Sequence, residues 1–387
     1  MTTFRYYAPV ALHIGRGCIR ENAGLFTRDG KRAFVITSRF APGCRNIALE
    51  DACQVLAEQG IAYSVCDEVE ENPSVESVRA ITDKMLDFAP DFILAIGGGS
   101  ALDTAKAANV LLGYPKGADA YEVFYDGVPA GTGSRSEGRL PLLGVPTTAG
   151  SGSEVAGYAV LTRHDKHTKQ RMNQLSFFND AFLDARYIEG SPQWLIDLGA
   201  LDALAHGIES SLNVANNFAS RMLADFGLML FREYKDRLMG RELTAEDYDN
   251  MLLAASVQGM AVVQSSTTLP HGMGYPLTHY KGISHGFASC VCLGEYLKIF
   301  RESGHQKTVQ ELLHRCGFGS ADELEDYLAQ IIRRNVDVKI TEEEVRQWTD
   351  GFSVDQGRLS RHPETVTAEE IYAVYHRSLE RLGALIT

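Results

Sequence analysis

The sequence predicts an α/β domain with a parallel sheet, followed by a domain made of helices. Short, near-continuous apolar runs alternate with helical stretches in the first half, which is typical of a parallel sheet covered on both faces. After about Ile188 the apolar runs end, and long segments of helical periodicity follow. We therefore expect an α/β domain over residues 1–187 and an all-helical domain over residues 188–387.

Five apolar, β-branched runs carry the prediction of strands in the first half. They are Arg32–Ser38, Tyr63–Cys66, Asp91–Ile96, Leu140–Val145 and Ala181–Leu183. Helical periodicity between these runs predicts helices at Ile47–Gln59, Val75–Phe88 and Ala101–Leu112. The polar, glycine-rich stretch Gly127–Gly138 is predicted to be a loop.

The second half is predicted to be helical, and its first helix is expected to begin just after Ser191-Pro192. The stretch that contains His271 and His285 is rich in glycine and is predicted to consist of turns. The predicted helices are Trp194–Leu212, Ala219–Met239, Ala245–Gln264, Ala321–Asn335 and Ala368–Leu382.

The composition is that of an ordinary globular protein, with 45% apolar residues in a chain of 387. The formal net charge of −13 argues against a nucleic acid or an anionic membrane as partner. No signal peptide is apparent, and no apolar stretch reaches the roughly 18 residues that a membrane span needs. Seven cysteines without a CxxC pair predict reduced thiols, so we expect a cytoplasmic protein.

Two polar loops follow predicted strands and are candidates for binding a dinucleotide. Gly97, Gly98, Gly99 and Ser100 come between a strand and a helix, where backbone N–H groups and the helix dipole favour a pyrophosphate. The alternative for this segment is a tight turn without a ligand. Pro146–Glu154 follows the next strand, and it combines hydroxyl groups with glycines. Two such loops at the carboxyl ends of strands fit the usual ligand position in open α/β sheets.

A metal site is predicted in the helical half. Asp202 and His206 are spaced i, i+4 on a predicted helix, so both side chains share one face. His271 and His285 each precede a glycine further along the chain. One carboxylate and three imidazoles, with a position left for substrate, suit catalytic Fe²⁺ or Zn²⁺. For each histidine alone the alternative is a structural role, and His279 is a further candidate.

Four sequence blocks together resemble the iron-containing, or group III, alcohol dehydrogenases. They are Gly97–Asp103, Pro146–Glu154, Asp202–Glu209 and His271–Gly286, in the order and spacing of that family. The resemblance implies a Rossmann-like domain and a helical metal-binding domain, the architecture also found in dehydroquinate synthase. It implies NAD or NADP as cofactor, one Fe²⁺ (with Zn²⁺ possible), a small alcohol or aldehyde as substrate, and a cytoplasmic homodimer.

The resemblance also implies roles for individual residues. The metal ligands would be Asp202, His206, His271 and His285. The cofactor would contact Asn72, Gly97, Gly98, Gly99, Ser100, Asp103, Thr147, Thr148, Ser151 and Lys169.

Two positions depart from the family pattern. Tyr275 stands where relatives often have a second histidine that helps proton transfer, and a tyrosine is a poorer base near neutral pH. His279 could substitute for that histidine, or no side-chain base is needed. Ser38 stands where NAD-preferring relatives commonly have an aspartate. Because Ser38 and Arg39 bring a cation and no carboxylate, they favour a 2′-phosphate, and NADP is predicted over NAD.

Two alternative functions remain open at this point. A dehydroquinate synthase-like lyase would share the fold, NAD and the metal, but it needs basic residues for a phosphorylated substrate. The residues next to His271 in the sequence contain few such groups. A non-catalytic nucleotide-binding module is the other alternative, and the four candidate metal ligands argue against it.

Overall fold

The computed structural model describes residues 3–39, 45–126, 139–166 and 168–386. The predicted loop at 127–138 lies outside these residues. The chain forms two compact units, and the second begins at Pro192, a few residues beyond the predicted boundary. The described residues before Tyr7 belong to this second unit and not to the α/β unit as predicted. Sheet pairing begins only at Ala11, so no strand pairing in the described residues ties residues 3–6 to the α/β unit.

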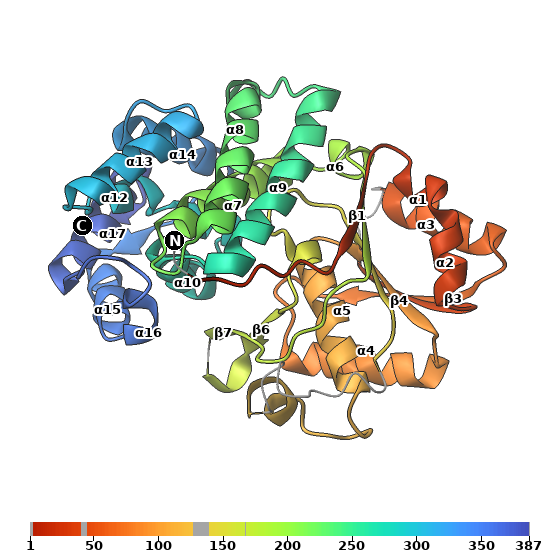
Figure 1. Ribbon diagram of the computed structural model, residues 1–387. Coiled ribbons are helices and arrows are strands. Elements are labelled where there is room, and N and C mark those ends of the chain that lie inside the picture. Colours follow the sequence, from red (N-terminus) through yellow and green to blue (C-terminus); the bar gives the residue numbers. More distant parts are fainter. Residues whose placement is uncertain (1–2, 40–44, 127–138, 167, 387) are drawn as a thin grey trace. The chain divides into compact units, whose positions relative to one another are not determined.

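The first unit is built on a six-stranded parallel sheet, which confirms the predicted fold class (Figure 1). Its strand order is β1-β8-β5-β4-β2-β3. The prediction missed β1 and the antiparallel pair of β6 and β7, because these four-residue strands are partly exposed and form no apolar run. The strands of this unit are β1 (Ala11–Ile14), β2 (Arg32–Ser38), β3 (Ala62–Val69), β4 (Phe92–Gly97), β5 (Leu142–Pro146), β6 (Val160–Arg163), β7 (Thr168–Arg171) and β8 (Asp180–Leu183).

Helices cover both faces of this sheet, and a separate apolar core fills each face. Side chains alternate along a strand, so Ala33 and Val35 of β2 face one core while Phe34 and Ile36 face the other. The first core contains residues of α1 to α3 and the second contains residues of α4 and α5. The helices are α1 (Cys18–Glu21), α2 (Ala23–Asp29), α3 (Ile47–Glu58), α4 (Val75–Phe88), α5 (Gly99–Leu112) and α6 (Arg186–Glu189).

The chain changes direction across the sheet between β2 and β4. From β2 the chain moves outward to β3, and it then returns to place β4 on the other side of β2. In open α/β sheets, ligands bind at the carboxyl ends of the strands where the order reverses. The loops that follow β2 and β4 therefore occupy the position expected for a ligand.

The second unit is mainly helical and contains one short parallel strand pair. The strands β9 (Ile340–Thr341) and β10 (Leu385–Ile386) correct the expectation of a purely helical domain. The stretch predicted as turns around His271 is helix α10, since burial overrides the low helix propensity of its glycines and Pro276. The helices are α7 (Gln193–Leu212), α8 (Phe218–Gly240), α9 (Ala245–Ser265), α10 (Leu269–Lys281), α11 (His285–Cys290), α12 (Leu293–Leu297), α13 (Ser303–Arg315), α14 (Ala321–Asn335), α15 (Glu342–Ser353), α16 (Gln356–Leu359) and α17 (Ala368–Leu382). Among the described helices, none combines the length and apolar composition that crossing a bilayer requires.

A buried glutamate on α14 makes the stability of this unit depend on pH. Glu325 is 2% exposed, and burial, together with the charge of Glu295, raises its pKa to about 7. The native state therefore holds the proton more tightly than the unfolded chain, whose pKa for this group is 4.5. Stability is highest below that value and falls as the pH rises through about 7, by up to roughly 3 kcal/mol.

We expect Glu325→Gln to remove this loss, because the amide carries no charge to bury. Urea unfolding of both proteins from about pH 5 to pH 8 measures the effect. The variant should lose less stability than the parent over this range. If the free energy of unfolding changes equally with pH in both proteins, Glu325 ionises in the native state without a loss of stability.

Candidate functional site

The predicted pair on α7 lies in the interior of the second unit. Asp202 and His206 are 5% and 8% exposed, and Nε2 of His206 is 3.9 Å from Oδ1 of Asp202. One turn of helix separates them, so both side chains point to the same side of α7. This part of the sequence prediction describes the local geometry correctly.

Two further histidines come to this pair from other helices. His271 lies in the first turns of α10, and His285 is the first residue of α11. The donor atoms of Asp202, His271 and His285 all lie within 4.8 Å of one another. His206 lies beside this group, with its ring stacked on that of His271 at a centroid distance of 4.8 Å. Elements far apart in the sequence thus bring the four predicted residues together.

Gly286 explains how α11 approaches α7 closely enough to place His285. A Cβ atom at Gly286 would lie 2.6 Å from the carbonyl oxygen of Leu198 and 3.0 Å from Cβ of Asp202. Any larger residue would push the two helices apart. The glycine after His285 in the sequence therefore serves the contact between α7 and α11.

A residue that the sequence analysis did not single out holds His271 in place. Glu209 is fully buried on α7, and its carboxylate accepts a hydrogen bond from Nδ1 of His271. The same carboxylate accepts from the backbone N–H of Thr268 at 2.8 Å and from the Thr268 hydroxyl at 3.2 Å. The spacing in the sequence could have indicated this residue, because Glu209 follows Asp202 by seven residues and so shares its helix face.

The buried donor set fits a divalent cation. When the neutral His271 ring donates from Nδ1 to Glu209, its lone pair lies on Nε2, and that atom has no hydrogen-bond partner among the described residues. Burial acts to raise the pKa of Asp202, but the neighbouring histidines outweigh it and keep that pKa low. Burial acts to lower the pKa of His271, and the charges of Glu209 and Asp202 outweigh it and raise that pKa. A bound cation would use the unpartnered nitrogen and the ionised carboxylate.

Tyr275 and His279 occupy different environments on α10. The Tyr275 ring stacks on that of His285 at 5.9 Å, so this tyrosine lies beside the donor group. Burial raises the pKa of Tyr275 although two arginines oppose the shift, so even less of the phenolate that could act as a base is present near neutral pH. His279 is exposed in the last turn of α10, where its ring meets Tyr280 edge-on. The structure does not bring His279 to the donor group.

The two polar loops of the first unit lie against each other. The N–H of Thr147 donates to the carbonyl of Gly97 at 3.0 Å. A Cβ at Gly98 would lie 3.0 Å from the Thr148 side chain, and one at Gly99 would lie 3.1 Å from Ser151. These glycines therefore permit close packing of the two loops, in addition to any role they have toward a ligand. The loops form one polar surface at the carboxyl ends of β4 and β5.

Asp103 and a lysine that the sequence analysis did not select hold the second loop to α5. Asp103 accepts from the Ser153 hydroxyl at 2.5 Å and from the N–H of Val160 at 2.8 Å. Nζ of Lys106 is fully buried, 2.9 Å from Asp103, and donates to Ser153 and to the carbonyls of Ala156 and Tyr158. Both Asp103 oxygens are thus used within the protein, where they fix the shape of the loop.

Asn72, Ser100 and Lys169 form a third part of this surface. The N–H of Asn72 donates to the Ser100 hydroxyl at 3.2 Å, and Nζ of Lys169 donates to Oδ1 of Asn72 at 2.6 Å. Asn72 has a positive φ of 57°, which is uncommon for a residue other than glycine and is often found at functional positions. The structure therefore gathers these three predicted residues in one place.

We expect Gly99→Val to weaken dinucleotide binding by at least about tenfold, because the new side chain displaces Ser151 and crowds the start of α5. Titration calorimetry with the cofactor measures the effect, and the metal content should not change. Gly24→Val is the matched control, since a Cβ at Gly24 meets nothing within 4 Å. Cofactor affinity equal to that of the parent would leave a tight turn as the only role of Gly99.

Ser38 and Arg39 lie at the end of β2, next to β3. Ser38 is half-buried and pairs with Glu68 and Val69 at an irregularity of the sheet. The exposed guanidinium of Arg39 faces Asp67 of β3, with Nε 3.3 Å from Oδ2. The sequence prediction did not include this carboxylate. An exposed pair of this kind contributes little free energy, so Arg39 remains able to change partner.

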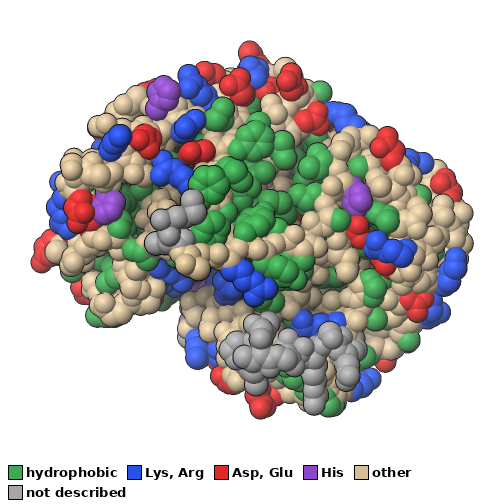
Figure 2. Space-filling view, viewed as in Figure 1, with side chains coloured by type: hydrophobic (Ala, Val, Ile, Leu, Met, Phe, Trp, Pro, Cys, Tyr) green, Lys and Arg blue, Asp and Glu red, His purple; other side chains and the backbone are tan. Residues whose placement is uncertain are grey.

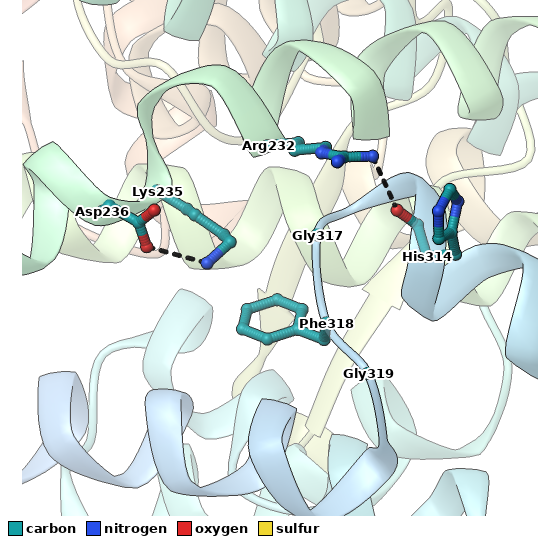
Figure 3. Close-up of a pocket in the computed structure, with 7 residues that line it drawn as sticks. All are labelled: Arg232, Lys235, Asp236, His314, Gly317, Phe318 and Gly319. Carbon is teal, nitrogen blue, oxygen red and sulfur yellow. Dashed lines mark hydrogen bonds and ion pairs between the residues drawn. The ribbon is translucent and has the colours of Figure 1, made fainter.

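A hollow of about 360 Å³ lies elsewhere on the second unit, between α8 and the end of α13 (Figure 3). Its cations have partners, because Lys235 pairs with Asp236 at 2.8 Å and Arg232 donates to the carbonyl of His314 at 3.4 Å. No predicted site residue lines it. The lining residues are Arg232, Lys235, Asp236, His314, Gly317, Phe318 and Gly319.

A parallel-sheet unit with polar loops at its switch point, together with a helical unit that holds an Asp/His cluster, suits an enzyme that uses a dinucleotide and a metal. Comparison with known proteins identifies the family. The family of iron-containing alcohol dehydrogenases matches residues 9–184, and the C-terminal part of the same family matches residues 198–379. The chain belongs to the iron-containing alcohol dehydrogenase family.

Individual relatives agree with this assignment. Alcohol dehydrogenase 4 of Schizosaccharomyces pombe is 29% identical over 302 residues, which cover 77% of this chain and 69% of the relative. Sulfoacetaldehyde reductase of Bilophila wadsworthia is 28% identical, with 75% of this chain and 73% of the relative covered. The solved iron-containing alcohol dehydrogenase of Thermotoga maritima is 30% identical with a TM-score of 0.85, and the match covers 98% of this chain and 100% of that one. The protein is thus an alcohol dehydrogenase or aldehyde reductase, and the lyase and the non-catalytic module are not supported.

Proposed function

We propose that this protein transfers a hydride between NAD(P)(H) and a small alcohol or aldehyde, with one Fe²⁺ held by Asp202, His206, His271 and His285. The observation that carries the proposal is the buried group of Asp202, His271 and His285, whose donor atoms lie within 4.8 Å of one another. The ligand types suit Zn²⁺ as well, and the family membership favours iron.

A bound divalent cation supplies a Lewis acid that polarises the substrate oxygen and lowers the pKa of an alcohol. The protein residues supply geometry and charge. Glu209 fixes the orientation and tautomer of His271, and the ionised Asp202 contributes the negative ligand. Because Tyr275 has a raised pKa, it acts as a hydrogen-bond donor beside His285 and not as the base.

The polar surface of the first unit is proposed to hold the dinucleotide. Gly98, Gly99 and Ser100 begin α5, where unpaired N–H groups and the helix dipole suit a pyrophosphate. Thr147, Thr148 and Ser151 would line the second loop, while Asn72 and Lys169 would contribute polar groups beside it. The position of this surface at the reversal of strand order supports the assignment.

The function is tested by following oxidation of NADH and NADPH with a panel of short aldehydes, on metal-loaded protein with and without chelator. We expect turnover that depends on metal and returns when Fe²⁺ is restored. Turnover that survives complete removal of metal would contradict the proposal. Measuring the metal bound by protein isolated without added ions distinguishes Fe²⁺ from Zn²⁺.

We further propose that NADP is preferred over NAD. The case is electrostatic, since Ser38 brings no carboxylate and the Arg39 guanidinium is able to leave the exposed Asp67 for a 2′-phosphate. A charge-assisted hydrogen bond contributes about 1.5–3 kcal/mol, or roughly 10- to 100-fold in affinity. Ser38→Asp should reverse the preference, because a carboxylate there repels the phosphate and accepts from the ribose hydroxyls.

Values of kcat/KM for NADH and NADPH with one aldehyde measure this preference in the parent and the variant. Asp67→Asn is a companion variant that frees Arg39, and it should increase the preference for NADPH. A preference of the parent for NADH by about tenfold or more, or no response to Ser38→Asp, would contradict the assignment.

We propose a cytoplasmic homodimer as the working form. Four large apolar residues, each more than 45% exposed, recur along α8 at helical spacing, and apolar side chains gather on this part of the surface (Figure 2). A reducing compartment would keep the six described cysteines as free thiols. Light scattering on the purified protein tests the dimer. The apolar residues of this stripe are Phe218, Met222, Phe226 and Met229.

A further inference from the structure

Two arginines from the segment after α15 lie beside the candidate metal site, although the sequence next to His271 is poor in basic residues. The Arg358 guanidinium lies over the Tyr275 ring, with its carbon 4.6 Å from the ring centroid. Its Nη1 donates to the carbonyl of Gly272 at 3.4 Å, and a Cβ at Gly272 would lie 2.9 Å from Cδ of Arg358. Arg358 is therefore packed against the residue that follows His271.

The second arginine, Arg361, lies just after α16 and contacts the turn before α10. Its Nη1 donates to the hydroxyl of Ser266 at 3.4 Å, at the turn between α9 and α10 that leads into His271. Arg361 thus contacts the turn that leads into His271, while Arg358 lies over the tyrosine that stacks on His285.

Arg361 has no counter-charge among the residues that the structure describes. Among the residues that the structure describes, no carboxylate forms an ion pair with it, and its only side-chain hydrogen bond is the long one to Ser266. Arg358 has one carboxylate neighbour, Asp355, with Nε 3.2 Å from Oδ2. Arg361 is half-buried, so part of its hydration is lost without full compensation. A bound anion would supply that compensation.

Arg358 lies next to the less buried members of the site. Asp202, His206 and His271 are buried, whereas His285 and Tyr275 are half-buried. The Arg358 guanidinium covers the ring of Tyr275, which in turn stacks on His285. A substituent that extends from the metal position past His285 and Tyr275 would meet this guanidinium.

We infer that the substrate is a short aldehyde or alcohol with an anionic substituent, a carboxylate, sulfonate or phosphate, which Arg361 and Arg358 bind. The inference rests on the proposed function and adds the substrate class to it. Guanidinium groups bind such oxyanions through two parallel hydrogen bonds, which a neutral substituent cannot match. Arg361 is the main determinant, because no described carboxylate pairs with its charge.

The test compares ω-oxo acids with their neutral methyl esters on metal-loaded protein with its reduced cofactor. The pairs are 3-oxopropanoate, 4-oxobutanoate and 5-oxopentanoate with their esters, and sulfoacetaldehyde extends the panel to a sulfonate. For the chain length that fits best, kcat/KM for the anion should exceed that for the ester by roughly 10- to 100-fold. In Arg361→Gln the ratio of anion to ester kcat/KM should fall close to one. Arg361→Lys should keep an intermediate ratio, and Arg358→Gln should lower the ratio below that of the parent.

Arg346→Gln is the matched control, since Arg346 is exposed on α15 and stacks on Tyr372, away from the candidate site. Its ratio should equal that of the parent. Calorimetry with succinate, an unreactive analogue of 4-oxobutanoate, provides a measurement that needs no turnover. Succinate should bind the parent at least about tenfold more tightly than Arg361→Gln.

Several outcomes would overturn the inference. Esters that react as well as the acids at every length would do so, as would a ratio that does not respond to either arginine. If the arginine variants show a higher KM for the cofactor but the same ratio of anion to ester kcat/KM as the parent, the arginines would be assigned to the cofactor phosphates instead. If the oxo acids and their methyl esters are reduced equally well, and both reactions depend on metal, the proposed function stands and only this inference fails.

Discussion

His271→Ala should lose bound metal and nearly all turnover while the helical unit stays folded. Nε2 of His271 is a buried nitrogen that forms no hydrogen bond with any described residue, and it belongs to the group of donor atoms that lie within 4.8 Å of one another. Removing it takes away one ligand outright. We expect metal affinity to fall by more than the 10- to 100-fold that losing an outer-shell partner costs, and turnover to fall with metal occupancy.

Metal analysis after dialysis, circular dichroism and steady-state rates measure the three parts of this expectation. His279→Ala is the matched control on the same helix, because His279 is exposed and separate from the donor group. It should keep both metal and activity. An active, fully metal-loaded His271→Ala protein would mean that the metal site has been assigned wrongly.

Glu209→Gln is expected to weaken metal binding by roughly 10- to 100-fold. The variant keeps the size of the side chain but removes the charge that holds the Nδ1 proton of His271. The imidazole is then less basic at Nε2, and the other tautomer, which presents no lone pair to the metal, becomes accessible. Glu209→Leu should show a larger loss of affinity, together with lower stability, because the N–H and hydroxyl of Thr268 also lose their acceptor.

Competition with a coloured chelator gives the metal dissociation constant for each variant. Glu233→Gln on α8 removes an exposed glutamate and should not alter this constant. If Glu209→Gln binds metal as tightly as the parent, the hydrogen bond to His271 serves only the packing of α7 against α10.

The sequence was informative wherever local patterns determine structure. The run Arg32–Ser38 was predicted with its observed bounds, and so was the helix Val75–Phe88, because apolar periodicity and capping residues are properties of neighbouring positions. Strands β1, β6 and β7 left no such pattern, since they are short and partly exposed. Helix α10 forms although its local composition disfavours a helix, because the burial of its residues outweighs the cost of two glycines and of the proline inside it.

For the site, the sequence by itself determined the residue types and their pairing on one helix face. The spacing of Asp202 and His206 placed them together, and the shared blocks identified the family. Only the tertiary structure brought His271 and His285 to that pair, since contacts between separate helices depend on packing that no local pattern encodes.

The same holds for the groups that modify the site. Glu209 behind His271, Asp67 beside Arg39, and Arg358 over Tyr275 are contacts across long stretches of chain. Their charges act on the tautomer of His271, on the Arg39 guanidinium and on the Tyr275 ring. Electrostatic interactions depend on distance in space and on burial, so only the folded chain could show which charged groups act on the site.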